Sequence, residues 1–189
     1  MNVKKFLCLM LAGALSLSLA ACGAGTPKVD YDTEFDALME RIEALSEKAD
    51  FVSTVNSVVW QEAGPEKVSS VLLELLTASD AGDLSYTAKN ALTDYSTTER
   101  TQIIKKYKEQ YTALSSELDT LKTDIKALKD ACGDDHDDGI DALQKYFSKL
   151  QAYAEFATSP SGNLMNYRSN HEDFENEMAE LKSAAEFDK

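Results

Sequence analysis

The chain has 189 residues, with 33 Asp and Glu against 19 Lys and Arg, and its formal net charge at pH 7 is −14. This balance argues against a nucleic-acid-binding protein, because such binding depends on Lys and Arg side chains that neutralise phosphates. It also argues against flat adhesion to an anionic membrane, which requires clusters of basic residues. The length is sufficient for a single domain that buries a substantial core.

The N-terminus has the three parts of a secretory signal peptide. Lys4 and Lys5 are positively charged, an apolar run without charges follows over residues 6–20, and small residues precede Cys22. The sequence LAAC at residues 19–22 resembles the lipobox of bacterial lipoproteins, in which a diacylglycerol is attached to the cysteine sulfur and the chain is cut just before it. The alternative is an ordinary signal peptide that ends near a cysteine by chance. We expect residues 1–21 to be removed and Cys22 to carry the lipid, which predicts an anchored protein at the extracytoplasmic face of the cell membrane.

Cleavage at this point would leave residues 22–189 without Lys4 and Lys5, so 17 basic residues would face 33 acidic ones and the net charge would be −16. The lipidated tether over residues 22–29 would reach about 25 Å at most, since an extended residue spans roughly 3.5 Å. Cys132 would be the only cysteine besides the lipidated one. No disulfide could then form within the domain, which must be stabilised by its apolar core.

Apolar residues recur every three or four positions from Tyr31 to Val59, which predicts one long helix over residues 30–63. The second half of this segment, residues 51–60, is rich in β-branched side chains and would suit a strand by propensity. A helix is the better interpretation because the apolar register continues through both halves and no partner strand is evident elsewhere.

Glycine and proline at residues 64–65 end this helix, and two short helices are predicted over residues 68–78 and 86–95. Residues 96–99 then have the pattern of a capping box, with a serine hydroxyl and a glutamate carboxylate three positions apart. This box precedes the clearest apolar repeat in the chain. The repeat predicts one helix of roughly 35 residues, about 50 Å long, that ends at Cys132.

After a break at residues 133–139, two more helices are predicted over residues 140–157 and 164–185, the second capped by Asn163. Long helices with continuous apolar seams pack against one another as bundles. The expected fold is therefore all-α, an elongated antiparallel helical bundle with coiled-coil-like seams that occupies residues 30–189.

Residues 134–139 (DDHDDG) place Asp, His, Asp and Gly at positions one, three, five and six of a calcium-binding EF-hand loop. The match fails at position twelve, where Lys145 stands instead of a bidentate glutamate. We expect a solvated turn in which Asp137 or Asp138 caps the next helix. Weak binding of a divalent cation is the alternative.

His171 and Glu175 stand four residues apart on a predicted helix and could form half of a metal site, but no third ligand is evident. His171 also falls on the apolar seam, so we expect a partly buried, hydrogen-bonded histidine. Cys132 ends an apolar seam and has no basic neighbour to activate it, which favours a small buried residue over a nucleophile. We expect core positions rather than a ligand groove for the other aromatic candidates, Trp60, Tyr107, Tyr111, Tyr146, Tyr153 and Tyr167.

The Ser-Pro-Ser-Gly sequence at residues 159–162, with Tyr167 and Phe174 downstream and a Val-Trp pair at residues 59–60, resembles a family of uncharacterised small all-helical lipoproteins of low-GC Gram-positive bacteria. The resemblance would cover most of residues 30–185. It implies the same helix layout and a Gram-positive origin, and it implies no activity.

The sequence therefore predicts a non-catalytic binding or interaction module, held at the membrane through the lipid on Cys22, with a protein as its partner. We expect no catalytic residue, cofactor, metal site or nucleic-acid partner. The alternative is a lipoprotein that binds a small ligand or a metal, through the loop at residues 134–138 or a groove lined by tyrosines. A deep pocket where His171 meets two or more carboxylates or tyrosines from other helices would argue strongly against the interaction module.

Overall fold

The computed structural model describes residues 29–189, and the expected signal peptide, Cys22 and nearly all of the tether lie outside the described residues. The all-α prediction is confirmed, since the described residues form helices joined by short turns and contain no strand. None of the helices over residues 29–189 combines the length and the apolar character needed to cross a membrane.

α1 spans Tyr31–Ala63, as the apolar period predicted. The side chain of Asp30 caps it by accepting a hydrogen bond from the backbone N–H of Thr33 at 3.4 Å. The segment rich in β-branched residues is helical, and its side chains Val52 and Val59 are completely buried. Burial in the core therefore outweighs the strand propensity of this segment.

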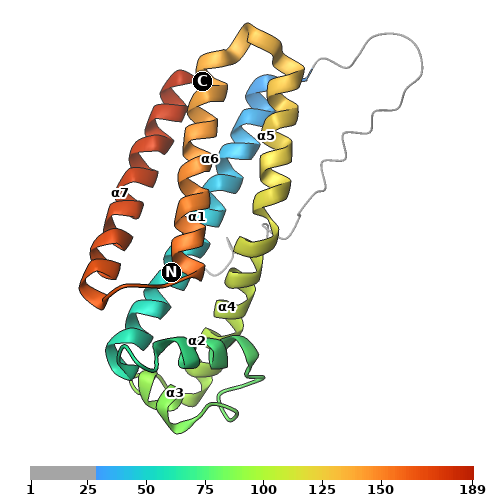
Figure 1. The fold of residues 1–189 in the computed structure, drawn as a ribbon. Coiled ribbons are helices and arrows are strands. Elements are labelled where there is room, and N and C mark those ends of the chain that lie inside the picture. The colour runs from blue at the N-terminus through green and yellow to red at the C-terminus, as the bar shows by residue number, and fades with distance from the viewer. Residues whose placement is uncertain (1–28) are drawn as a thin grey trace, which may run out of the picture.

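α2 (Val68–Thr77) and α3 (Tyr86–Ala91) form a cap across one end of the bundle (Figure 1). The prediction for α3 was too long, because a helix was expected to continue to residue 95. The chain leaves the helix at Leu92, whose N–H bonds to the carbonyl of Lys89 rather than to that of the fourth residue back. Such a tightened last turn commonly ends a helix.

The single helix predicted up to Cys132 is wrong, because α4 (Thr97–Ser116) and α5 (Leu118–Cys132) are separated at Glu117. The capping box of Ser96 and Glu99 is confirmed, with both of its hydrogen bonds formed. Two serine side chains bond back to the helix just before the interruption. Ser115 and Ser116 donate hydroxyl hydrogen bonds to carbonyls four residues back, at 3.0 and 2.9 Å, and such bonds bend helices.

A short 3₁₀ helix, η2 (Gly133–His136), leads into α6 (Asp137–Thr158), and α7 (Leu164–Asp188) completes the chain. Asn163 caps α7 as predicted, because its side-chain oxygen accepts from the N–H of Asn166 at 3.0 Å. α1 and α6 lie in contact at the centre of the bundle, with α4 and α5 on one side of this pair and α7 on the other (Figure 1). α4 and α5 together run opposite to α1, α6 runs opposite to them, and α7 runs opposite to α6, which confirms the antiparallel arrangement.

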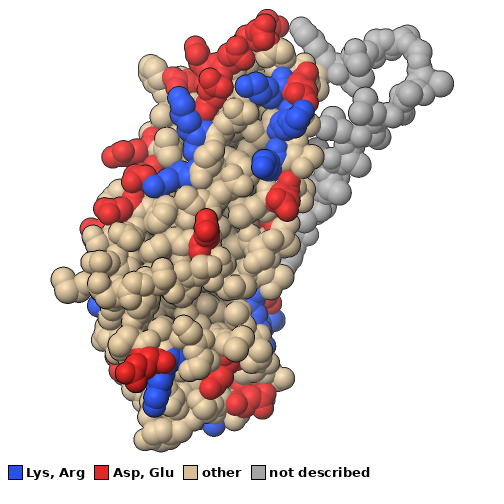
Figure 2. Space-filling model, in the orientation of Figure 1, with Lys and Arg blue, Asp and Glu red and all other residues tan. Residues whose placement is uncertain are grey.

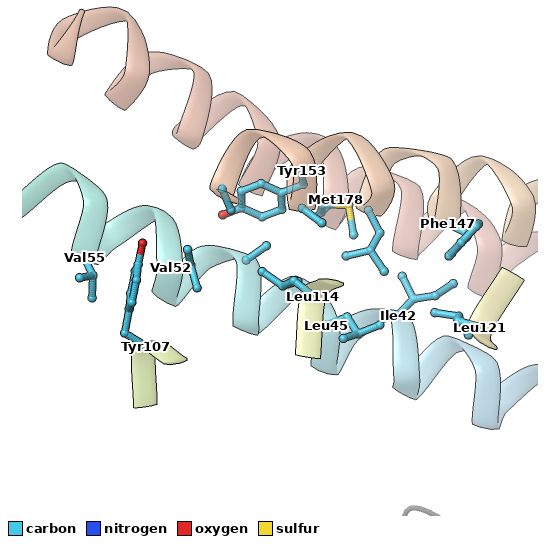
Figure 3. Packing of buried hydrophobic residues seen from close by; sticks show 14 of the residues in the cluster. Ile42, Leu45, Val52, Val55, Tyr107, Leu114, Leu121, Phe147, Tyr153 and Met178 are labelled. Carbon is cyan, nitrogen blue, oxygen red and sulfur yellow. The ribbon is translucent and has the colours of Figure 1, made fainter. Parts of the chain in front are cut away.

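The core runs the length of the bundle, and Figure 3 shows Ile42 and Leu45 of α1 packed near Leu114 of α4 and Leu121 of α5. All four side chains are at most 2% exposed. Leu118, which the seam predicted to be equally buried, is only partly buried. It directly follows the interruption at Glu117.

A polar node ties four helices together inside this core. The side-chain amide of Asn56 on α1 donates to the carbonyl of Ala157 at 2.7 Å and to the hydroxyl of Tyr167 at 3.1 Å. The Tyr107 hydroxyl donates to the Asn56 side-chain oxygen at 2.8 Å. Because Asn56 is fully buried and its bonds reach α4, α6 and α7, the node sets how these helices align with α1.

Candidate functional site

A groove that is open to solvent runs between α1 and α7, and side chains of α6 form its floor. Tyr146, Tyr153 and Met178 are buried beneath it, and Figure 3 shows Tyr153 beside Met178. The rim carries carboxylates and one amine. The lining residues that carry charge are Glu43, Glu47, Asp50, Glu175, Lys182 and Glu186.

The electrostatics of this groove are dominated by negative charge, since its five carboxylates face the single amine of Lys182. Lys182 is itself engaged, because its Nζ lies 2.6 Å from a carboxylate oxygen of Glu43 and 4.0 Å from one of Glu186. The hydrogen bond to Glu43 raises the pKa of Lys182, although partial burial opposes this effect. The groove therefore keeps a net negative charge at neutral pH.

At one end of the groove, Nε2 of His171 lies 3.0 Å from Oδ1 of Asp50, and Glu175 stands one helical turn further along α7. The His171 side chain is 12% exposed and that of Asp50 is 46% exposed. The prediction of a partly buried, hydrogen-bonded His171 is confirmed. The structure also brings Asp50 to the pair formed by His171 and Glu175, so that ligand atoms of all three residues lie within 4.8 Å of one another.

Tyr153 of α6 lies beside this trio, with its ring centroid 5.9 Å from that of His171. The Tyr153 hydroxyl is buried and forms no well-aligned hydrogen bond, although the equally buried Ser53 hydroxyl lies close to it. Burial raises the pKa of the Tyr153 phenol, and the charges of Asp50 and Glu175 raise it further. Phe174 stacks on the Tyr153 ring at 5.0 Å and holds it in place between α6 and α7.

The acidic turn at residues 134–138 does not form an EF-hand loop. Its first residues belong to η2, and the chain is α-helical from Asp137 past Lys145, so the later ligand positions cannot curve around an ion. The predicted cap at Asp137 or Asp138 is wrong, because His136 occupies the cap position and no side chain bonds there. Both aspartates lie in the first turn of α6 instead, where the helix dipole favours negative charge.

The remaining candidates lie apart from the groove. His136 stacks on Tyr31 with ring centroids 3.7 Å apart, at the end of the bundle where α1 begins, and is not brought to His171. Cys132 is partly buried rather than fully buried as predicted. Burial, and then the charge of Asp135, raise the pKa of its thiol, whereas a reactive cysteine needs a lowered pKa.

The core positions predicted for Trp60, Tyr107, Tyr146, Tyr153 and Tyr167 are confirmed, and Tyr111 is half-buried. Tyr146 and Tyr153 also contribute to the floor of the groove.

Asp50 could not be found from the sequence, because nothing near residue 50 signals a ligand. Its partner His171 lies 121 residues further along the chain.

The fold and the groove define an all-α bundle with an acidic, solvent-open surface site. Comparison of the chain with protein-family models, with curated proteins and with solved structures finds no match in any of the three.

Proposed function

We propose that the protein is a lipid-anchored, extracytoplasmic and non-catalytic module that binds a basic segment of a partner protein in the groove between α1 and α7. The observation that carries this proposal is the charge of the groove, where five carboxylates face one amine that is already paired. An open acidic groove with an apolar floor suits Lys and Arg side chains, whose methylene stems pack on apolar surface while their charges meet carboxylates.

The position of the start of α1 supports a location close to the membrane. α1 begins at the same end of the bundle as η2 and the end of α7, where acidic side chains gather (Figure 2). A lipid on Cys22 would hold this acidic end within about 25 Å of the bilayer. Anionic lipid headgroups would repel it, so the bundle would stand away from the surface with the groove along its side open to a partner.

Two observations favour binding over catalysis. The groove is an open surface rather than an enclosed cavity that excludes water, which catalysis by preorganised charge requires. The raised pKa of the Cys132 thiol works against a nucleophile.

Crosslinking on intact cells followed by affinity capture of the lipoprotein tests the proposal. Glu47 and Glu186 are exposed in the groove, and Glu47→Arg with Glu186→Arg reverses their charge. The matched control is Glu109→Arg with Asp119→Arg, which makes the same charge change at exposed positions of α4 and α5 on the other side of the bundle.

We expect the control variant to capture the same partner as the unchanged protein and the groove variant to lose it. The capture should also weaken steeply with salt, because association driven by charge is screened. Equal capture by both variants, or insensitivity to salt, would contradict binding in the groove.

A further inference from the structure

One imidazole nitrogen and two carboxylate oxygens converge at the end of the groove, from His171, Asp50 and Glu175. Such a donor set suits Zn²⁺, which binds nitrogen and oxygen ligands at about 2.0–2.2 Å. Three ligand atoms around one ion then lie roughly 3–3.5 Å apart. The Nε2 to Oδ1 distance between His171 and Asp50 is already 3.0 Å, and Glu175 is an exposed side chain that is free to rotate toward them.

A second feature of the site is a buried hydroxyl that forms no well-aligned hydrogen bond. The Tyr153 side chain is 1% exposed and lines the same groove as Asp50 and Glu175. Its hydroxyl forms no well-aligned hydrogen bond, although the equally buried Ser53 hydroxyl lies close to it. A buried hydroxyl without a good hydrogen bond lowers the stability of the folded state. A ligated water, or a carboxylate drawn toward an ion, would supply the missing acceptor, and such outer-shell bonds orient metal ligands.

The geometry points to a zinc ion bound by Asp50, His171 and Glu175, with Tyr153 bonding a ligand or a ligated water and a fourth position open to solvent. This site does not rest on the partner proposed above, but a bound zinc ion would offset the charge of two of the groove's five carboxylates. Because Asp50 belongs to α1 and the other two ligands to α7, a bound ion would link these two helices. Among the described elements α7 packs only against α1 and α6, so zinc would clamp α7 in place.

The nitrogen ligand separates this site from a general acidic surface that attracts cations. Calcium and magnesium are hard cations that prefer oxygen ligands and seldom use imidazole. Zinc should therefore bind in the presence of millimolar calcium, which should leave its affinity unchanged. A site made only of carboxylates would lose zinc under the same condition.

Calorimetric titration of the metal-free full chain in detergent with zinc chloride tests the site. We expect His171→Ala and Glu175→Gln each to lower the zinc affinity by about 100-fold or more, since loss of an outer-shell partner alone costs about 10- to 100-fold. The matched controls are His136→Ala and Glu172→Gln, which alter the other histidine and an exposed glutamate of α7. Both controls should bind as the unchanged chain does. Cysteine thiols remain in every variant, so any zinc that they hold does not distinguish them.

The role of Tyr153 is tested by Tyr153→Phe, which keeps the ring and removes only the hydroxyl. We expect a loss of about tenfold in zinc affinity, whereas Tyr146→Phe, on the same helix and in the same groove, should have no effect. Circular dichroism in the absence of zinc should show the same helix content for all variants.

Zinc should also raise the thermal unfolding midpoint of the unchanged chain and not that of His171→Ala, because a ligand of the folded state stabilises it. Zinc binding of equal affinity in His171→Ala and the unchanged chain would overturn the site, as would displacement of zinc by calcium. Absence of binding to the unchanged chain at millimolar zinc would overturn it equally, and would leave the contact of His171 with Asp50 as a simple hydrogen bond.

Discussion

Replacement of Asn56 by Leu removes the polar node at the centre of the bundle without a large change in side-chain volume. Three hydrogen bonds are lost, those with Tyr107, Tyr167 and the carbonyl of Ala157. Each partner is then left buried and unsatisfied, at a cost of about 1–3 kcal/mol apiece. Because Ser53 is close enough to lower the pKa of Tyr167 through a hydrogen bond, it offers that hydroxyl a second partner. We therefore expect the low end of the sum, a loss of about 3–5 kcal/mol in the free energy of unfolding.

Urea denaturation of the full chain, followed by far-ultraviolet circular dichroism, measures this loss. The urea concentration at the midpoint should fall. The slope of the free energy of unfolding against urea concentration should stay constant, because the surface exposed on unfolding is unchanged. Asn176→Leu is the matched control, since Asn176 is an exposed residue of α7, and its effect should stay within about 0.5 kcal/mol. A loss below about 1 kcal/mol for Asn56→Leu would refute the conclusion that this node stabilises the alignment of the four helices.

Four further predictions follow from the structure. Leu121→Ala should cost about 2–5 kcal/mol in urea denaturation, and Leu118→Ala clearly less, because Leu121 is completely buried and Leu118 is not; equal losses would contradict the interruption at Glu117. Cys22→Ala should abolish incorporation of labelled fatty acid and either release the protein from the membrane fraction or leave the precursor uncut; a variant that still incorporates the label would refute the anchor. Burial raises the pKa of Tyr31 and of Tyr146 to about 12 from an ordinary value of 10.0. Both phenols therefore favour the folded state below pH 10, and this contribution to stability is lost as the pH rises from about 10 to 12. Tyr146→Phe should flatten the fall of the urea midpoint across this window, and an unchanged profile would argue against burial as the cause of the raised pKa. Calcium should bind weakly or not at all at residues 134–138, where the EF-hand geometry is absent; a micromolar dissociation constant in calorimetry that disappears in Asp134→Ala with Asp138→Ala would show otherwise.

The helices could be predicted from the sequence because apolar period and capping residues are local signals. The bounds of α1 and the capping box at Ser96 and Glu99 follow from residues within a few positions of one another. The interruption at Glu117 could not be found in this way. The apolar period runs through it unbroken, and no proline or glycine marks it in the sequence.

The candidate site was only half visible in the sequence. The spacing of His171 and Glu175 places both on one face of a helix, which is a local consequence of the helical period. Asp50 and Tyr153 join them only because α1 and α6 pack against α7. Contacts of this kind depend on helix packing, which a single sequence does not specify residue by residue.

The most direct test of the proposed function is a photocrosslink from inside the groove on living cells. Ala179 is an exposed residue in the groove lining, and Thr120 is an exposed residue of α5 on the other side of the bundle. A benzophenone amino acid placed at each position in turn would report what lies against that face. Binding in the groove predicts a protein adduct from position 179 that is absent from position 120 and disappears when Glu47→Arg and Glu186→Arg are introduced. An adduct from position 120 alone, or one from position 179 that survives the charge reversal, would contradict it.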